Sequence, residues 1–169
     1  MRKIICILLI MLFLCGCKGK SNTMPVLNGI TFDADITYYN EAYKGSCSLL
    51  NGVFKFTVSE PELLSGYTLT FDGDSVTAEY LGITYTPNKS NMPFSSVAGE
   101  IYQKLTEIIN SSDAAVKSGD SYVIEGGQGR DAYKLYISSV GIPLSLEIPD
   151  ERFTVYFYNS TIKEIEKAG

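Results

Sequence analysis

Apolar and polar side chains alternate along the chain from residue 29 to residue 86. In the segment ITFDADITYY (30–39), Phe32 and Ile36 fall on one face, while Asp33 and Asp35 fall on the other. A period of two is typical of a half-buried β-strand with one wet face. The same alternation predicts strands at residues 43–49, 54–58, 67–71, 76–80 and 83–86, and again at 121–126, 131–138, 142–148 and 152–158.

Residues 94–109 follow a different period. The apolar positions that recur there with helical spacing are Phe94, Val97, Ile101, Leu105 and Ile108. Glu100 and Lys104 lie four residues apart on the opposite face, where they are expected to form an ion pair. This pattern predicts one amphipathic helix of about four turns, roughly 24 Å long.

Many more residues are predicted to lie in strands than in the helix. A sheet of about ten strands at about 4.8 Å spacing is roughly 48 Å across, which is far wider than one helix of about 10 Å. We therefore expect a mainly β (α+β) fold, in which a curled antiparallel sheet of about ten strands forms an incomplete β-barrel. The amphipathic helix would pack in or across the opening.

One continuous apolar face is the candidate binding surface. Its predicted members on the first strands are Phe32, Ile36, Phe54, Phe56, Leu69 and Phe71, and those on the far side are Leu144, Leu146, Phe153 and Phe157. The helix offers five large apolar residues, which are too few to cover this face. The face is therefore either a closed core or a hydrophobic cleft that takes an acyl chain.

The N-terminal segment carries a processing signal. Arg2 and Lys3 precede an apolar run over residues 4–14, which is shorter than the ~20 residues of a membrane-spanning helix and fits a signal peptide. The stretch LCGC resembles the lipobox of bacterial lipoproteins. That resemblance implies that Leu14, Cys15 and Gly16 are recognised, and that Cys17 receives a diacylglycerol thioether and becomes the new N-terminus.

Four regions follow from this interpretation. Residues 1–16 are a cleaved signal peptide, 17–28 a lipidated N-terminus and flexible tether, 29–160 the β domain and 161–169 a short charged tail. Cleavage would remove two of the 14 basic residues and none of the 19 acidic ones. A net negative chain has no basic footprint for nucleic acid. The signal peptide and the lipobox predict an extracytoplasmic location, on a bacterial membrane through the lipid on Cys17.

The composition restricts the chemistry. The chain has no histidine, which removes Ser-His-Asp and Cys-His catalysis and the commonest zinc ligand. Asp33 and Asp35 are interpreted as two solvated charges on a wet face. The glycine-rich stretch EGGQGR (125–130) does not match a phosphate-binding loop and is interpreted as a hairpin turn. We predict no catalytic residue, no metal site, no cofactor and no enzymatic activity.

Three stretches carry a resemblance to a known family. They are VSEPELLSGYTLTFDGDSVTAEYLGITYT (58–86), the predicted helix, and SSVGIPLSLEIPDERFTVYFYN (138–159). Together they are similar to the LolA/LolB-like lipoprotein-carrier fold. The resemblance implies a half-barrel that holds acyl chains, or a periplasmic regulator that senses envelope components. A free shuttle does not fit a chain that is tethered by its own Cys17.

Two functional hypotheses follow from the sequence. The first is a membrane-anchored, non-enzymatic binding module for a lipid-like or hydrophobic envelope ligand. The second is a protein-interaction or envelope-sensing module with a closed, ligand-free core. The expected partners are the membrane, through the N-terminal lipid, and either a lipid or acyl chain in the cleft or an envelope protein.

The lipid anchor gives the first testable prediction. Cells that express the wild-type chain should incorporate a labelled fatty acid into it, whereas Cys17→Ser should stay unlabelled because it lacks the acceptor thiol. Gel fluorography of the two proteins measures this. Equal labelling of both would contradict the assignment of Cys17.

Overall fold

An open antiparallel sheet dominates the structure. The computed structural model describes residues 29–73, 75–86, 93–110 and 115–162, with the side chains of 93–96 and 108–110 left out. Within these ranges eleven strands form one sheet in the order β6-β5-β4-β3-β2-β1-β11-β10-β9-β8-β7. The first six are β1 (Ile30–Tyr38), β2 (Glu41–Leu50), β3 (Val53–Glu60), β4 (Thr68–Asp72), β5 (Ser75–Tyr80) and β6 (Ile83–Tyr85). The others are β7 (Val116–Ser118), β8 (Ser121–Gly126), β9 (Tyr133–Ser138), β10 (Pro143–Ile148) and β11 (Phe153–Ile162).

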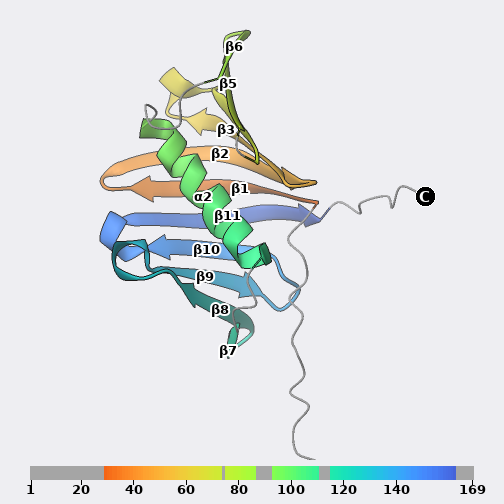
Figure 1. Cartoon of the computed structure of the whole chain (residues 1–169), viewed down its shortest axis with the longest axis vertical. Coiled ribbons are helices and arrows are strands. Elements are labelled where there is room, and N and C mark those ends of the chain that lie inside the picture. The colour runs from red at the N-terminus through yellow and green to blue at the C-terminus, as the bar shows by residue number, and fades with distance from the viewer. Residues whose placement is uncertain (1–28, 74, 87–92, 111–114, 163–169) are drawn as a thin grey trace, which may run out of the picture.

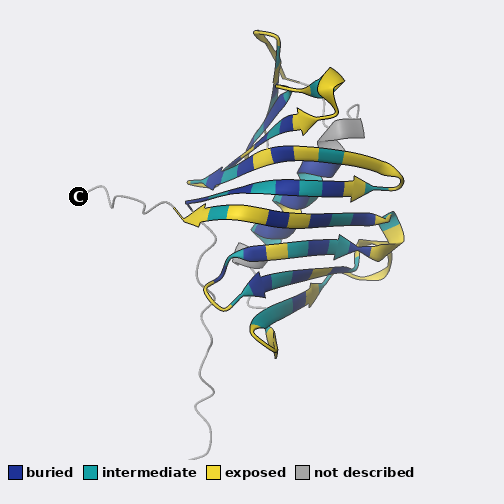
Figure 2. Cartoon of the chain, turned by 180° about the vertical axis from the view of Figure 1, so that it is seen from behind, coloured by how far each residue is buried: buried dark blue, intermediate teal, exposed yellow. Residues whose placement is uncertain are grey.

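Helix α2 (Pro93–Asn110) runs diagonally across one face of this sheet (Figure 1). Seen from behind, the strands lie in front of the helix, and buried and exposed residues alternate along them (Figure 2). We call the face that contacts α2 the inner face and the opposite one the outer face. Three short 3₁₀ segments complete the described elements: η1 (Glu62–Leu64), η3 (Gly129–Asp131) and η4 (Pro149–Glu151).

Strand β1 joins the two halves of the chain. It pairs with β2, which follows it in sequence, and with β11, which ends the sheet-forming part of the chain. Phe32 lies opposite Cys47 of β2, and Ile36 lies opposite Val155 of β11. All of these side chains are buried on the inner face, because directly opposed residues of an antiparallel pair share a face. The centre of the core is therefore built on β1, β2 and β11.

The predicted fold class is confirmed. The sheet is antiparallel and does not close, and α2 lies within one residue of the predicted helix at each end. The sequence pattern missed β7, whose three residues are all exposed and carry no apolar alternation. Strand β11 also continues to Ile162, past the domain boundary expected at residue 160. The predicted signal peptide and tether, residues 1–28, lie outside the described residues.

Two glycines make room for aromatic rings on neighbouring strands. A Cβ on Gly45 of β2 would lie 2.6 Å from the ring of Phe56 and 2.5 Å from the carbonyl oxygen of Thr57. A Cβ on Gly126 would lie 2.5 Å from the ring of Tyr133, its register partner on β9. Both rings thus cover the glycine backbone across the strand pair, and neither position has space for a side chain.

These contacts predict opposite effects for two glycine-to-alanine changes. Gly45→Ala should lower the free energy of unfolding by about 1–3 kcal/mol, because the added methyl overlaps a fixed carbonyl and a buried ring. Gly99→Ala is the matched control: its Cβ meets Phe71 at 3.7 Å, an ordinary contact. Because alanine favours a helix, Gly99→Ala should raise the free energy of unfolding by up to about 1 kcal/mol.

Urea denaturation of both variants tests this. Equal effects of the two changes would show that the cross-strand packing of Phe56 on Gly45 does not constrain the sheet.

Candidate functional site

The inner face gathers most of the predicted cleft residues. Nine of the ten are buried, with exposed fractions from 0% to 6%. They are Phe32, Ile36, Phe54, Phe56, Leu69, Phe71, Leu146, Phe153 and Phe157. Phe32 and Phe157 meet edge to face with ring centroids 5.0 Å apart, which ties β1 to β11. Nine of the ten residues predicted to form one apolar face therefore belong to one buried cluster.

Leu144 is the exception and corrects the prediction. It is 41% exposed, and Pro143 occupies the buried position beside it. The register between β9 and β10 shifts between Pro143 and Ser145, so the alternation that places Leu146 inside does not extend back to Leu144. Leu144 does not line the inner face.

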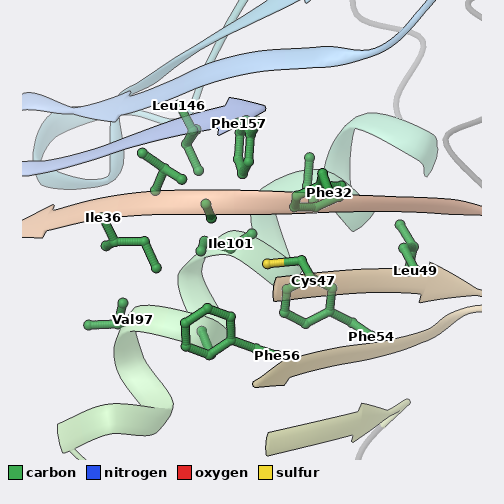
Figure 3. Packing of buried hydrophobic residues seen from close by; sticks show 14 of the residues in the cluster. Phe32, Ile36, Cys47, Leu49, Phe54, Phe56, Val97, Ile101, Leu146 and Phe157 are labelled. Carbon is green, nitrogen blue, oxygen red and sulfur yellow. The ribbon is translucent and has the colours of Figure 1, made fainter. Parts of the chain in front are cut away.

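Helix α2 covers the centre of the inner face with a stripe of small and branched side chains. Val97, Ala98, Ile101 and Leu105 are buried, each at 2% exposure or less. Figure 3 shows Val97 and Ile101 of α2 facing side chains of the sheet, with Ile36 and Phe56 on either side. Phe94 and Ile108, the other predicted members of the stripe, lie outside the described side chains.

Tyr102 extends this contact beyond the predicted stripe. Its ring stacks on Phe71 with centroids 5.3 Å apart and on Phe54 at 5.9 Å. Phe54 and Phe71 are register partners on β3 and β4, so the ring of Tyr102 packs α2 against both of these strands. Tyr102 directly follows Ile101 in sequence, at the border of the apolar stripe, which is the signal that could have identified it.

Lys104 is buried against the other half of the sheet. It is 4% exposed, its Nζ lies 5.1 Å from the ring centroid of Tyr133, and the same Nζ lies 3.5 Å from Glu107 Oε2. The predicted ion pair with Glu100 is therefore replaced by one with Glu107. A buried ammonium needs such partners, and the face of an aromatic ring together with a carboxylate supplies them.

Glu100 lies half-buried in the acidic surroundings of this cation. Burial raises the pKa of its carboxyl above the ordinary value for glutamate, and the charge of Glu151 raises it further. Lys104 acts in the opposite direction, while Asp131 and Glu107 add smaller upward contributions. Folding therefore shifts the pKa of Glu100 upward, which makes its carboxyl easier to protonate than in the unfolded chain.

The outer face carries the aspartates that the sequence placed on a wet surface. The Tyr158 hydroxyl donates to Asp35 Oδ1 at 3.0 Å, and the Asn159 amide donates to Asp33 Oδ2 at 2.9 Å. These bonds cross from β11 to β1. Among the described residues no cluster of three or more His, Cys, Asp or Glu side chains has the arrangement of a metal site.

A hollow lies at the turn from β8 to β9. It has a volume of about 300 Å³ and is lined by residues that include Gly127, Tyr133 and Pro149. Lys134 and Glu125 also line it, and they form an ion pair 2.7 Å long. Gly127 has φ +70°, and a Cβ there would overlap the carbonyl of Asp131, so EGGQGR is a tight turn that requires glycine. This agrees with its interpretation as a hairpin connection.

The lipobox residues Leu14, Cys15, Gly16 and Cys17 lie outside the described residues. In the part of the chain that the structure describes, no helix combines the length and the apolar character that crossing a bilayer requires. The described core contains one free cysteine, Cys47, which is buried between β1 and β3.

Comparison with known proteins finds distant structural likenesses. No protein-family model matches the chain, and no curated protein matches its sequence. A LolA superfamily protein from Nitrosomonas europaea is 11% identical, with a TM-score of 0.43 over 86% of this chain and 90% of that one. An uncharacterized conserved protein from Thermus thermophilus is 12% identical, with a TM-score of 0.47 over 83% of each chain.

A DUF1329 family protein from Desulfovibrio piger is 8% identical, with a TM-score of 0.42 over 86% of this chain and 88% of that one. The fold class given above rests on the strand order and register of this chain itself.

The surroundings of Glu100 predict a pH-dependent stability. A carboxyl whose pKa is raised by folding contributes most below its unfolded pKa, and this contribution is lost as the pH rises through the folded pKa. Glu100→Gln mimics the neutral form, so it should raise the Tm at neutral pH and lose that advantage in acid. Calorimetry across this range, with exposed Glu62→Gln as the matched control, measures the effect. A gain in Tm that is the same at all pH values would show that the ionisation of Glu100 does not lower the stability.

Proposed function

We propose that the chain is a bacterial lipoprotein that acts as a non-enzymatic binding module, held outside the cytoplasm on a membrane by lipid-modified Cys17. The positive start, the short apolar run and LCGC support the anchor. The absence of histidine from the whole sequence supports a role in binding over the common acid–base chemistries.

The ligand is proposed to be lipid-like, or the apolar part of an envelope component, bound on the inner face. The observation that carries this is that nine large apolar side chains from both halves of the sheet lie in one buried cluster with the apolar stripe of α2. In this proposal α2 is a cover that an apolar ligand displaces, at least in part. The resemblance of the sequence to lipoprotein carriers agrees with such a ligand class.

The magnitudes allow this exchange. The large buried side chains of the α2 stripe, Val97, Ile101 and Leu105, contribute roughly 5–9 kcal/mol if each is worth about 1.5–3 kcal/mol. An acyl chain of about fourteen carbons gains roughly 11 kcal/mol at about 0.8 kcal/mol per methylene. The two contributions are of the same size, so a long acyl chain would offset the loss of the helix contacts.

A second candidate function is an interaction module whose core stays closed. Phe56 and Leu69 expose no surface, and Tyr102 of α2 stacks on Phe54 and Phe71. A ligand cannot reach these groups unless α2 moves. If α2 does not move, binding takes place on the exterior of the sheet, and the partner is an envelope protein.

Uptake of a fluorescent fatty acid distinguishes the two functions. A chain that begins at Lys18 keeps every described element and should take up the probe at one saturable site. Gly99→Ala, which stabilises α2, should bind the probe about fivefold more weakly, because about 1 kcal/mol more is needed to displace the helix. Tyr102→Ala, which removes the stacking on Phe54 and Phe71, should bind it more tightly.

Thermal denaturation of both variants is the control for folding. A folded wild-type chain that takes up no probe and carries no co-purified lipid would refute the ligand proposal, and the closed interaction module would replace it. An affinity for the probe that is the same in wild type and in both variants would show that the site is not under α2.

A further inference from the structure

A part of the inner face extends beyond helix α2, at the β6 end of the sheet. In Figure 1, β5 and β6 rise above the end of the helix. Ile83 pairs with Tyr80, and Tyr85 pairs with the fully buried Ala78, so Ile83 and Tyr85 continue the inner face. Yet Ile83 is 70% exposed and Tyr85 is 49% exposed. We call this surface, with Leu63, Tyr67, Tyr80 and Leu81, the β6 corner.

The β6 corner is fixed in position by its tyrosines. The Tyr80 hydroxyl donates to the carbonyl oxygen of Leu63 at 2.7 Å, which holds η1 against β5. Tyr67 meets Tyr80 edge to face at 5.9 Å. Burial and a hydrogen bond with Tyr85 raise the pKa of Tyr67, so Tyr67 links η1, β5 and β6. An apolar surface held this firmly is a preorganised contact surface.

Among the described strands, β6 is the last one at this edge of the sheet, beside these side chains. Leu81 and Gly82 have φ values of 51° and 78°, which is the pattern of a two-residue type I′ turn. Tyr80 and Ile83 flank this turn as the hydrogen-bonded pair, so the following pair, Glu79 and Thr84, is non-hydrogen-bonded. The amide and carbonyl of Thr84 therefore point away from β5, toward the open edge, where a further strand can pair.

The charge around this edge selects the partner. Residues 56–88 contain five acidic and no basic residues. Glu60 pairs with Lys44 at 3.2 Å, but within the described residues neither Glu62 nor Glu79 makes an ion pair. Such a surface repels anionic lipid headgroups, and joining two β6 edges would bring like charges together. It attracts a cationic chain.

We propose that the β6 corner binds an extended, basic and apolar segment of another protein, which adds to the sheet as a strand next to β6. The edge of Thr84 supplies main-chain hydrogen bonds, Ile83 and Tyr85 contact alternate apolar side chains, and Glu62 and Glu79 attract the basic ones. This function lies outside the part of the inner face that α2 covers, and it does not depend on a lipid ligand.

The opposite edge of the sheet supplies a matched control. Strand β7 is also three residues long and exposed, and its Val116 is 66% exposed, close to the value for Ile83. However, β7 itself carries the cation Lys117, and Asp120 follows it in the turn to β8. Ile83→Lys and Val116→Lys therefore make the same chemical change at the two edges.

The test uses the chain that begins at Lys18 and a short fluorescent peptide in which lysine and valine alternate. Anisotropy should show saturable binding that weakens about tenfold or more in Ile83→Lys and stays unchanged in Val116→Lys. A peptide in which glutamate replaces lysine should bind at least about tenfold more weakly. Exchange of the Thr84 amide, followed by NMR, should slow when the lysine peptide binds.

Several results would overturn the proposal. They are equal effects of the two lysine variants, equal binding of the two peptides, and an unchanged Thr84 amide. Dimers that Ile83→Lys dissociates would identify a second copy as the occupant. Vesicles of phosphatidylcholine that bind wild type but not Ile83→Lys would identify a lipid surface. Tighter peptide binding by Val26→Asp would show that the chain's own segment 18–28 holds the edge.

Discussion

The burial of one apolar sheet face by one amphipathic helix is the constraint on which the rest of this structure depends. Nine of the eleven described strands, all except β6 and β7, place buried apolar side chains in the core, and α2 adds Val97, Ala98, Ile101 and Leu105 to it. The strands must curl toward the helix, because a flat sheet of this width would leave most of its inner face in water. At Gly99 the helix also lies close to the ring of Phe71 on β4, which a Cβ there would meet at 3.7 Å.

The same constraint divides the molecule into a covered centre and uncovered ends. At the centre, β1 joins β2 to β11, and the side chains of both halves reach α2. On one side Tyr102 holds the helix to β3 and β4, and on the other Lys104 holds it to Tyr133 of β9. Beyond these two contacts the inner face is open at β6, where Ile83 and Tyr85 remain exposed. The proposed ligand site under α2 and the proposed strand addition at β6 would therefore use different parts of one apolar surface.

The sequence predicts the parts of this arrangement that follow from periodicity. Alternation identifies Phe32, Phe56 and Leu69 as one face, and the register aligns them in one row across β1 to β4, with Cys47 between Phe32 and Phe56. It fails at Leu144, where a register shift that depends on the neighbouring strand reverses the alternation. It also fails at Lys104, which lies on the polar side of the predicted helix. Its contact with the ring of Tyr133 cannot be read from the helix, because Tyr133 belongs to the distant β8–β9 hairpin, where its ring covers Gly126.

Native-state hydrogen exchange is the most direct test of whether α2 is a cover that can separate from the sheet. The account predicts that the amides of α2 open at a lower free energy than those of β1 and β11, and that a fatty acid accelerates exchange in α2 while β1 and β11 stay protected. Amides of α2 that exchange only with global unfolding, with or without the fatty acid, would contradict it. The helix would then be a permanent part of the core.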